Sequence, residues 1–136
     1  MKLSHLLFWY CITCTSLPTW ASDNPFIGTW QLVSGEYLNE NKEIIAYSTL
    51  GIRSQKVINA SHFSFVSFSD DKFWAAGTGQ YSFNATQYIE TPTMASYPLE
   101  GDGTYTFTYE IKGDQWHNAR WHDGIRVEYE IWQKVK

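Results

Sequence analysis

The stretch Phe26-Ile27-Gly28-Thr29-Trp30-Gln31-Leu32-Val33-Ser34 decides the fold that we predict for this chain. Trp30 and Leu32 alternate with the polar residues Thr29 and Gln31, which is the pattern of a half-buried β-strand. A glycine two positions before a tryptophan would place the indole so that it plugs one end of a sheet closing around it. The rest of the chain agrees with this starting point.

Working outward, the sequence continues as short strands separated by polar turns. No long window shows helical periodicity, and candidate strands recur about every 8 to 12 residues. The clearest alternation covers residues 104–111, where Tyr105, Phe107, Tyr109 and Ile111 share one face. This spacing is typical of an antiparallel meander.

An open meander of this length would leave two long edges unpaired, and closure removes both of them. We therefore predict an all-β fold, an antiparallel up-and-down β-barrel of about 8–10 strands. The alternative is a two-sheet sandwich with a filled core. Residues 92–103, which are interrupted by proline and glycine, are predicted to form a long loop over one end.

Three strands carry patterns that bear on what faces the interior. Residues 62–69 alternate and then slip by one position, which indicates a bulge or burial of both faces. Gly77 and Gly79 lie in mid-strand and predict sharp bending or close approach of another backbone. For the last strand we expect an apolar inner face, made of Ile125, Val127, Tyr129, Ile131 and Val135.

Residues 1–21 have the three-part pattern of a secretory signal peptide, with a basic start, an apolar run and a small residue at the cleavage site. The apolar run is shorter than the roughly 20 residues that a membrane-spanning helix needs. We predict cleavage after Ala21, a single domain over 22–136, a periplasmic or secreted location and no stable membrane insertion. A membrane anchor or a buried strand is the alternative.

The composition of residues 22–136 excludes several kinds of site. Cys11 and Cys14 both fall in the predicted signal peptide, so the exported domain would hold no disulfide and no thiolate metal site. Removal of Lys2 changes the net charge from −4 to −5, and lysine and arginine do not cluster. Nucleic acid is therefore not an expected partner. The high aromatic content, 18% of the chain, indicates a densely packed core or an aromatic-lined cavity.

Gly28-Thr29-Trp30 resembles the Gly-x-Trp signature of the lipocalin and fatty-acid-binding (calycin) barrels. The chain is more specifically similar to a small lipocalin-like family of unknown function, found mostly in bacteria. The motifs that carry this likeness are Gly28–Ser34, Ser61–Phe63, Gly79–Phe83, Tyr88–Glu90, Lys112–His117 and Glu130–Val135. The resemblance implies a lipocalin-like barrel that encloses a cavity for a small, largely apolar molecule.

The resemblance gives a structural signature of Gly28, Trp30, Trp132 and Lys134. Calycins often place an arginine from the last strands over the N-terminal tryptophan, and Lys134 stands at the matching position. Fatty-acid-binding proteins hold a carboxylate with Arg-x-Tyr on one strand face. Here Arg126 and Tyr129 are three residues apart and fall on opposite faces of a regular strand. Binding of a fatty-acid carboxylate is therefore not implied.

Residues 115–122 mix polar and aromatic side chains on both faces of the predicted strand. One face would carry Trp116, Asn118, Arg120 and His122, and the other Gln115, His117, Ala119 and Trp121. If the strand forms a cavity wall, Arg120 would hold an anionic ligand head, with Trp116 or Trp121 stacked on the ligand body. A strand exposed on both sides is the alternative.

Two further groups are candidates for chemistry. Tyr88 and Glu90 share a strand face, and burial in an apolar barrel would raise the pKa of the Glu90 carboxyl and suit it to acid, base or anchor roles. We favour the interpretation that Glu90 is exposed. His117 and His122 are five residues apart and point to opposite faces of a strand, so we predict no metal site.

These observations favour a non-catalytic binding or carrier protein for a small apolar or amphipathic molecule held in a barrel cavity. The candidate ligand-binding residues are Trp116, Arg120, Trp121, Tyr88, Glu90 and His117. We predict no catalytic residues and no cofactor. One alternative is a solid-core protein-interaction module of the cell envelope that presents Trp74, Trp121 or Trp132 to a protein partner. A third hypothesis is an isomerase of barrel type that uses Glu90 or a histidine.

Overall fold

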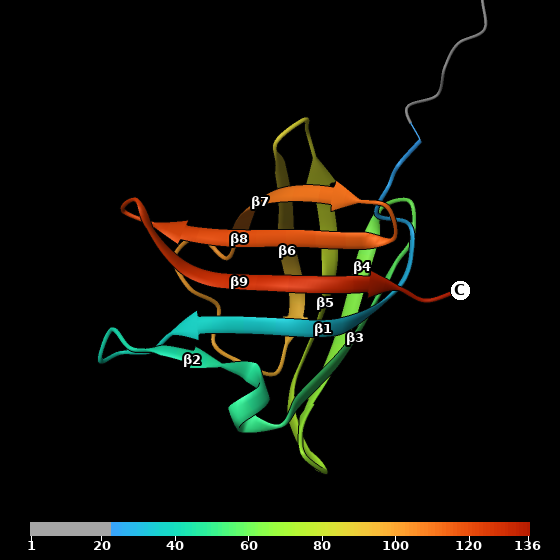
Figure 1. Ribbon diagram of the computed structural model, residues 1–136. Helices are drawn as coiled ribbons and strands as arrows, with labels where there is room; N and C mark the ends of the chain where they lie inside the picture. Colours follow the sequence, from blue (N-terminus) through green and yellow to red (C-terminus); the bar gives the residue numbers. More distant parts are fainter. Residues whose placement is uncertain (1–22) are drawn as a thin grey trace, which may run out of the picture.

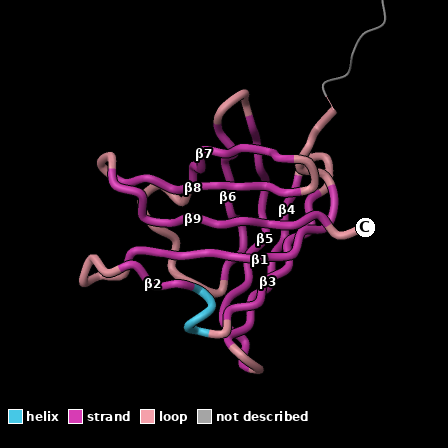
Figure 2. Tube along the Cα trace, in the orientation of Figure 1, coloured by secondary structure: helices cyan, strands magenta, loops and turns pink. Residues whose placement is uncertain are grey.

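The computed structural model describes residues 23–136, so the predicted signal peptide over 1–21 lies outside the described residues. The described chain forms nine strands and one short 3-10 helix, η1 (Figure 2). In chain order they are β1 (Gly28–Leu38), β2 (Ile44–Ala46), η1 (Tyr47–Leu50), β3 (Ile52–Ile58), β4 (His62–Ser69), β5 (Lys72–Phe83), β6 (Gln87–Ala95), β7 (Tyr105–Lys112), β8 (Gln115–His122) and β9 (Ile125–Lys134). Within these residues, no helix has the length and apolarity to cross a bilayer.

The strands close into an antiparallel up-and-down β-barrel, which confirms the predicted fold class. Strands β3 to β9 follow one another in order, and β1 pairs with β3 on one edge and with β9 on the other. The short strand β2 continues along the β3 edge of β1, beyond the last residue that pairs with β3. The barrel itself therefore has eight strands, with β2 as an extension of one wall.

Figure 1 shows β7, β8, β9 and β1 side by side across the front, with β3 to β6 crossing behind them at a steep angle. The first and last strands are joined over most of their length, from Trp30 opposite Lys134 to Tyr37 opposite Glu128. A bulge at Val33 shifts this register, so Trp30 and Leu32 face inward before it and Gly35 and Tyr37 after it.

One half of the barrel is filled by aromatic side chains, which we call the aromatic plug. It consists of Phe26, Trp30, Phe63, Tyr88, Phe107, Trp116 and Trp132, together with Ile58. The ring of Phe26 lies 4.7–5.1 Å, centroid to centroid, from four neighbouring rings, and its carbonyl accepts a 2.7 Å hydrogen bond from Trp30 Nε1. The segment before β1 thus closes this end.

The structure corrects the expected inner face of the last strand. From Glu128 to Lys134 the even-numbered residues of β9 face the interior: Glu130 and Trp132 are buried, and Glu128 lines the cavity. The odd-numbered residues Tyr129 and Ile131 lie on the outer face, and a bulge at Val127 places Arg126 on that face as well, opposite Trp121. Because side chains alternate between the two faces of a strand, choosing the wrong inner face exchanges inside and outside for every residue. The sequence-based prediction therefore placed the Glu128 and Glu130 carboxylates on the outer face.

Two smaller expectations also change. Strand β4 alternates without a slip, since Val66 and Phe68 face outward, and the bulge lies in the neighbouring strand β5. The predicted loop over 92–103 is shorter, because β6 continues to Ala95. Pro92 is tolerated there because β6 pairs with β7 only as far as Glu90, and because a bulge in β6 lies opposite Gly79.

Candidate functional site

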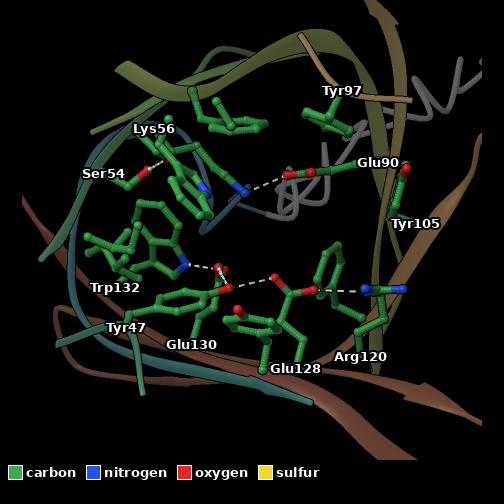
Figure 3. A pocket seen from close by; sticks show the side chains of 18 of the residues that line it. Tyr47, Ser54, Lys56, Glu90, Tyr97, Tyr105, Arg120, Glu128, Glu130 and Trp132 are labelled. Carbon is green, nitrogen blue, oxygen red and sulfur yellow. Dashed lines mark hydrogen bonds and ion pairs between the residues drawn. The ribbon is translucent and has the colours of Figure 1, made fainter. Parts of the chain in front are cut away.

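The half of the barrel opposite the aromatic plug is hollow. It contains a cavity of about 660 Å³ whose walls come from most of the strands and from η1 (Figure 3). The apolar lining includes Leu32, Leu50, Ile52, Phe65, Trp74, Phe107 and Trp132, and the polar lining includes Tyr47, Ser54, Lys56, Ser67, Glu90, Tyr97, Tyr105, Arg120, Glu128 and Glu130. Trp74, Pro98 and Glu100 are exposed to solvent and mark the mouth.

A buried ion pair crosses the inner end of the cavity, from Lys56 on β3 to Glu90 on β6 (Figure 3). The Nζ–Oε1 distance is 2.6 Å, and the two side chains are only 5% and 7% exposed. Five aromatic rings surround the ammonium with centroids 5.0–5.9 Å from Nζ. Both the carboxylate and the ring faces favour the charged lysine, which offsets part of the cost of burying it.

A second polar group lies on the β8–β9 wall. Arg120 Nε donates a 2.9 Å hydrogen bond to Glu128 Oε2, and the Tyr47 hydroxyl contacts Glu128 Oε1 at 3.0 Å and Glu130 Oε1 at 3.4 Å. Trp132 Nε1 donates to Glu130 Oε2 at 2.8 Å. The five side chains form a chain of contacts across the cavity wall (Figure 3).

Tyr47 reaches this wall because of a glycine. Its ring lies against Gly35, where a Cβ atom would come within 2.3 Å of the tyrosine Cδ2. Any side chain at position 35 would displace the ring and its hydroxyl from the two carboxylates. Burial, followed by the charges of Glu130 and Glu128, raises the pKa of Tyr47, so this hydroxyl stays protonated.

Glu130 holds its proton unusually well for a carboxyl group. Burial, followed by the charge of Glu128, raises its pKa from the ordinary 4.5 to about 7, although Lys56 and the Trp132 hydrogen bond act in the opposite direction. The pKa of Tyr97, also in the wall, is raised to about 12, mainly by burial and then by Glu90. The site therefore contains one carboxyl that keeps its proton to a clearly higher pH than an exposed glutamate does.

Glu130 makes stability depend on pH. Between pH 4.5 and 7 the folded protein holds a proton that the unfolded chain has released, so stability falls as pH rises. The cost is absent below pH 4.5, fully present above pH 7, and on the order of 3 kcal/mol. We expect Glu130→Gln to gain stability relative to wild type from pH 5 to pH 8 in urea unfolding. Exposed Glu110→Gln should track wild type, and parallel wild-type and Glu130→Gln curves would refute this assignment.

The structure brings only two of the six predicted ligand-binding residues to the cavity, Arg120 and Glu90. Glu90 is 5% exposed, so the expectation that it is a surface carboxylate is wrong. Tyr88 and Trp116 face inward but belong to the aromatic plug, where both are fully buried. Trp121 and His117 lie on the outer face of β8.

These positions change the roles first assigned to the β8 residues. Trp121 is 51% exposed and donates to Thr108 Oγ1 on the neighbouring strand, so it does not stack on a ligand beside Arg120. His117 contacts the Tyr129 hydroxyl at 2.8 Å on the outside of the barrel. Arg120 is already engaged by Glu128 and, at 3.3 Å, by Glu100, so it is not free to hold an anionic head.

The residues of the structural signature lie together at the closed end. Lys134 Nζ is 5.3 Å from the centroid of the Trp30 ring, and its side chain passes over Gly28. Trp132 is 2% exposed, so it is not available as a surface contact for a partner. Four further cavity residues were not predicted from the sequence: Lys56, Tyr47, Glu128 and Glu130. The strict alternation of Ser54, Lys56 and Ile58 was a usable signal for Lys56, because Ile58 belongs on the core face.

The fold and the site place the protein among eight-stranded antiparallel β-barrels with a polar and aromatic cavity at one end. This arrangement is consistent with a calycin-like architecture. No family model matches the chain, and no curated protein matches it. Among solved structures, the chain is similar to an uncharacterized protein from Bacteroides eggerthii, with 12% sequence identity and a TM-score of 0.48. The match covers 80% of this chain and 98% of that chain.

Proposed function

We propose that this protein is an exported, lipocalin-like binding or carrier protein that holds a small amphipathic molecule in the barrel cavity without transforming it. The observation that carries the proposal is the cavity itself. Its volume of about 660 Å³ lies within the range of about 300–1,000 Å³ that small-molecule sites occupy. Its lining combines aromatic walls, which suit an apolar ligand body, with polar and charged groups that suit a polar ligand head.

The groups proposed for catalysis are poorly placed to react. Glu90 is held by Lys56 at 2.6 Å, and His117 lies outside the barrel. The interaction-module hypothesis needed a filled interior and offered Trp74, Trp121 or Trp132 as the exposed contact. Trp74 and Trp121 are exposed, but Trp132 is buried and half of the interior is hollow. Binding inside the barrel is therefore the function that the geometry supports best. The export signal and the motif resemblance belong to the same proposal.

A titration with a neutral, environment-sensitive apolar dye tests the proposal. We expect saturable, one-to-one binding with increased dye fluorescence. Ala75 lines the cavity, whereas Ala76 follows it on β5 with its side chain on the outer face, opposite Val66. Ala75→Trp should therefore fill the cavity and weaken binding at least about tenfold, and Ala76→Trp should not. Equal affinity of the two variants, or no saturable binding to wild type, would refute a cavity function.

A further inference from the structure

The charges inside the cavity do not balance. Lys56 is paired with Glu90, and Arg120 is paired with Glu128 and with Glu100 at the mouth. Within residues 23–136, no lysine, arginine or histidine forms an ion pair with Glu130, whose hydrogen-bond partners are the neutral groups Trp132 Nε1 and Tyr47 Oη. The wall around Glu130 therefore has one carboxyl group more than it has cations.

Hydrogen-bond donors are also too few on this wall. The Tyr47 hydroxyl has one hydrogen but contacts both Glu128 and Glu130, so it can donate to only one of them. Asn118 lies opposite Glu130 on the neighbouring strand and is 2% exposed, yet neither its amide oxygen nor its nitrogen has a partner in the described chain. Asn118 is not among the residues that line the cavity, and its amide does not supply Glu130 with a hydrogen bond.

The aromatic walls suit a positive charge as well as an apolar body. Trp132, Phe65, Tyr97 and Tyr105 line the cavity beside the carboxylates. Two of them, Trp132 and Phe65, already lie against one ammonium, that of Lys56, and the Arg120 guanidinium lies 5.7 Å from the Tyr105 ring centroid. Aromatic faces attract cations more strongly where the cation is shielded from water.

A metal ion fits these walls less well than an organic cation does. Within residues 23–136, no three histidine, cysteine, aspartate or glutamate side chains are placed to hold a metal together. An anionic ligand would meet Glu90, Glu128 and Glu130, while both basic side chains already have carboxylate partners. Repulsion from these carboxylates would outweigh what the engaged cations can offer.

Resting on the proposed function, we infer that the ligand is an amphipathic organic cation, an amine or quaternary ammonium. Its charged group lies beside Glu130 and Glu128, and its apolar part lies against the aromatic walls toward the mouth. Glu130 thereby gains a cationic partner, because no side chain within residues 23–136 forms an ion pair with it.

Binding of such a cation is coupled to a proton. Burial raises the pKa of Glu130 to about 7, and the groups that face it are Glu128, Lys56, Glu90, Arg120 and Tyr47. A cation placed beside Glu130 favours its ionised form, so binding near neutral pH releases a proton. Cation affinity is therefore expected to increase from pH 6 to pH 8.

Calorimetric titration at pH 7.5 with three probes tests the inference: benzyltrimethylammonium, its uncharged carbon isostere neopentylbenzene, and the anion phenylmethanesulfonate. We expect the cation to bind about tenfold more tightly than the isostere and the anion to bind most weakly. Glu130→Gln should remove most of this preference while keeping affinity for the isostere. Glu110→Gln, an exposed carboxylate on the outer face of β7, should preserve it.

Each outcome has a distinct meaning. Equal affinity for cation and isostere, or tighter binding of the anion, would overturn the cation inference and leave the binding function intact, because the neutral dye tests that function separately. If Glu130→Gln fails to fold, Glu128→Gln replaces it, because Glu128 is the other carboxylate beside the proposed cation. Glu128→Gln should lower the preference for the cation over the isostere, and an unchanged preference would refute a role for the two carboxylates.

Discussion

Replacing Lys56 with methionine is expected to lower the free energy of unfolding by about 3–5 kcal/mol, because it leaves Glu90 buried without its partner. Glu90→Gln removes the other half of the pair and leaves a buried ammonium, so we expect a loss of similar size. The double variant Lys56→Met/Glu90→Gln removes both charges and should recover most of the loss, since an uncharged pair does not pay the desolvation cost of two ions. Urea unfolding of the four proteins measures this cycle.

The exposed pair Arg53–Asp71 is a matched control. Its N–O distance is 3.4 Å, and its side chains are 66% and 103% exposed. Exposed pairs contribute about 0–1 kcal/mol, so Arg53→Met should change stability little. If the double variant lost as much stability as the two single variants combined, Lys56 and Glu90 would not act as a pair.

Replacing Trp116 with alanine is expected to cost about 3–5 kcal/mol of stability, the amount typical of removing a fully buried tryptophan. Its ring contacts those of Phe26, Trp30 and Tyr88, with centroids 4.8–5.5 Å apart, at the centre of the aromatic plug. Loss of this side chain opens a hole that the surrounding rings can fill only in part. Thermal and urea unfolding, followed by circular dichroism, measure the change.

Trp121 provides the control on the same strand. It is 51% exposed on the outer face of β8, so Trp121→Ala should cost no more than about 1 kcal/mol, including its hydrogen bond to Thr108. Equal effects of the two substitutions would contradict the placement of Trp116 in the filled interior and of Trp121 on the outer face.

The sequence predicted the barrel well because alternation and turn spacing are local signals that the closed sheet satisfies. The cavity was harder to predict because it depends on which face of each strand points inward. For β9, two expectations were in conflict. If Lys134 lies over Trp30, strand alternation also turns Trp132, Glu130 and Glu128 inward. The apolar residues from Ile125 to Ile131 favoured the opposite face as the inner one. The pairing of Trp30 with Lys134 prevails in the structure.

The apolar residues of β9 gave a wrong prediction of its inner face, because the interior of the barrel is not uniformly apolar. The hollow half contains charged groups, and apolar side chains on the outer face of β9 are partly covered by their neighbours, as Tyr129 is by Arg126 and His117. Tyr47 could not have been assigned to the site from sequence. It comes from a short helix and meets Glu128 across 81 residues of chain, through a gap that exists only because position 35 is glycine.

The most direct test of a ligand inside the hollow half is a ¹⁵N–¹H spectrum of the tryptophan indoles during titration with the neutral dye. The Trp132 indole donates to Glu130 in the cavity wall, whereas the Trp121 indole lies outside the barrel. We predict a saturable shift of the Trp132 signal and no shift of the Trp121 signal. A shift confined to Trp121, or an unchanged Trp132 signal with saturating dye, would contradict the proposal.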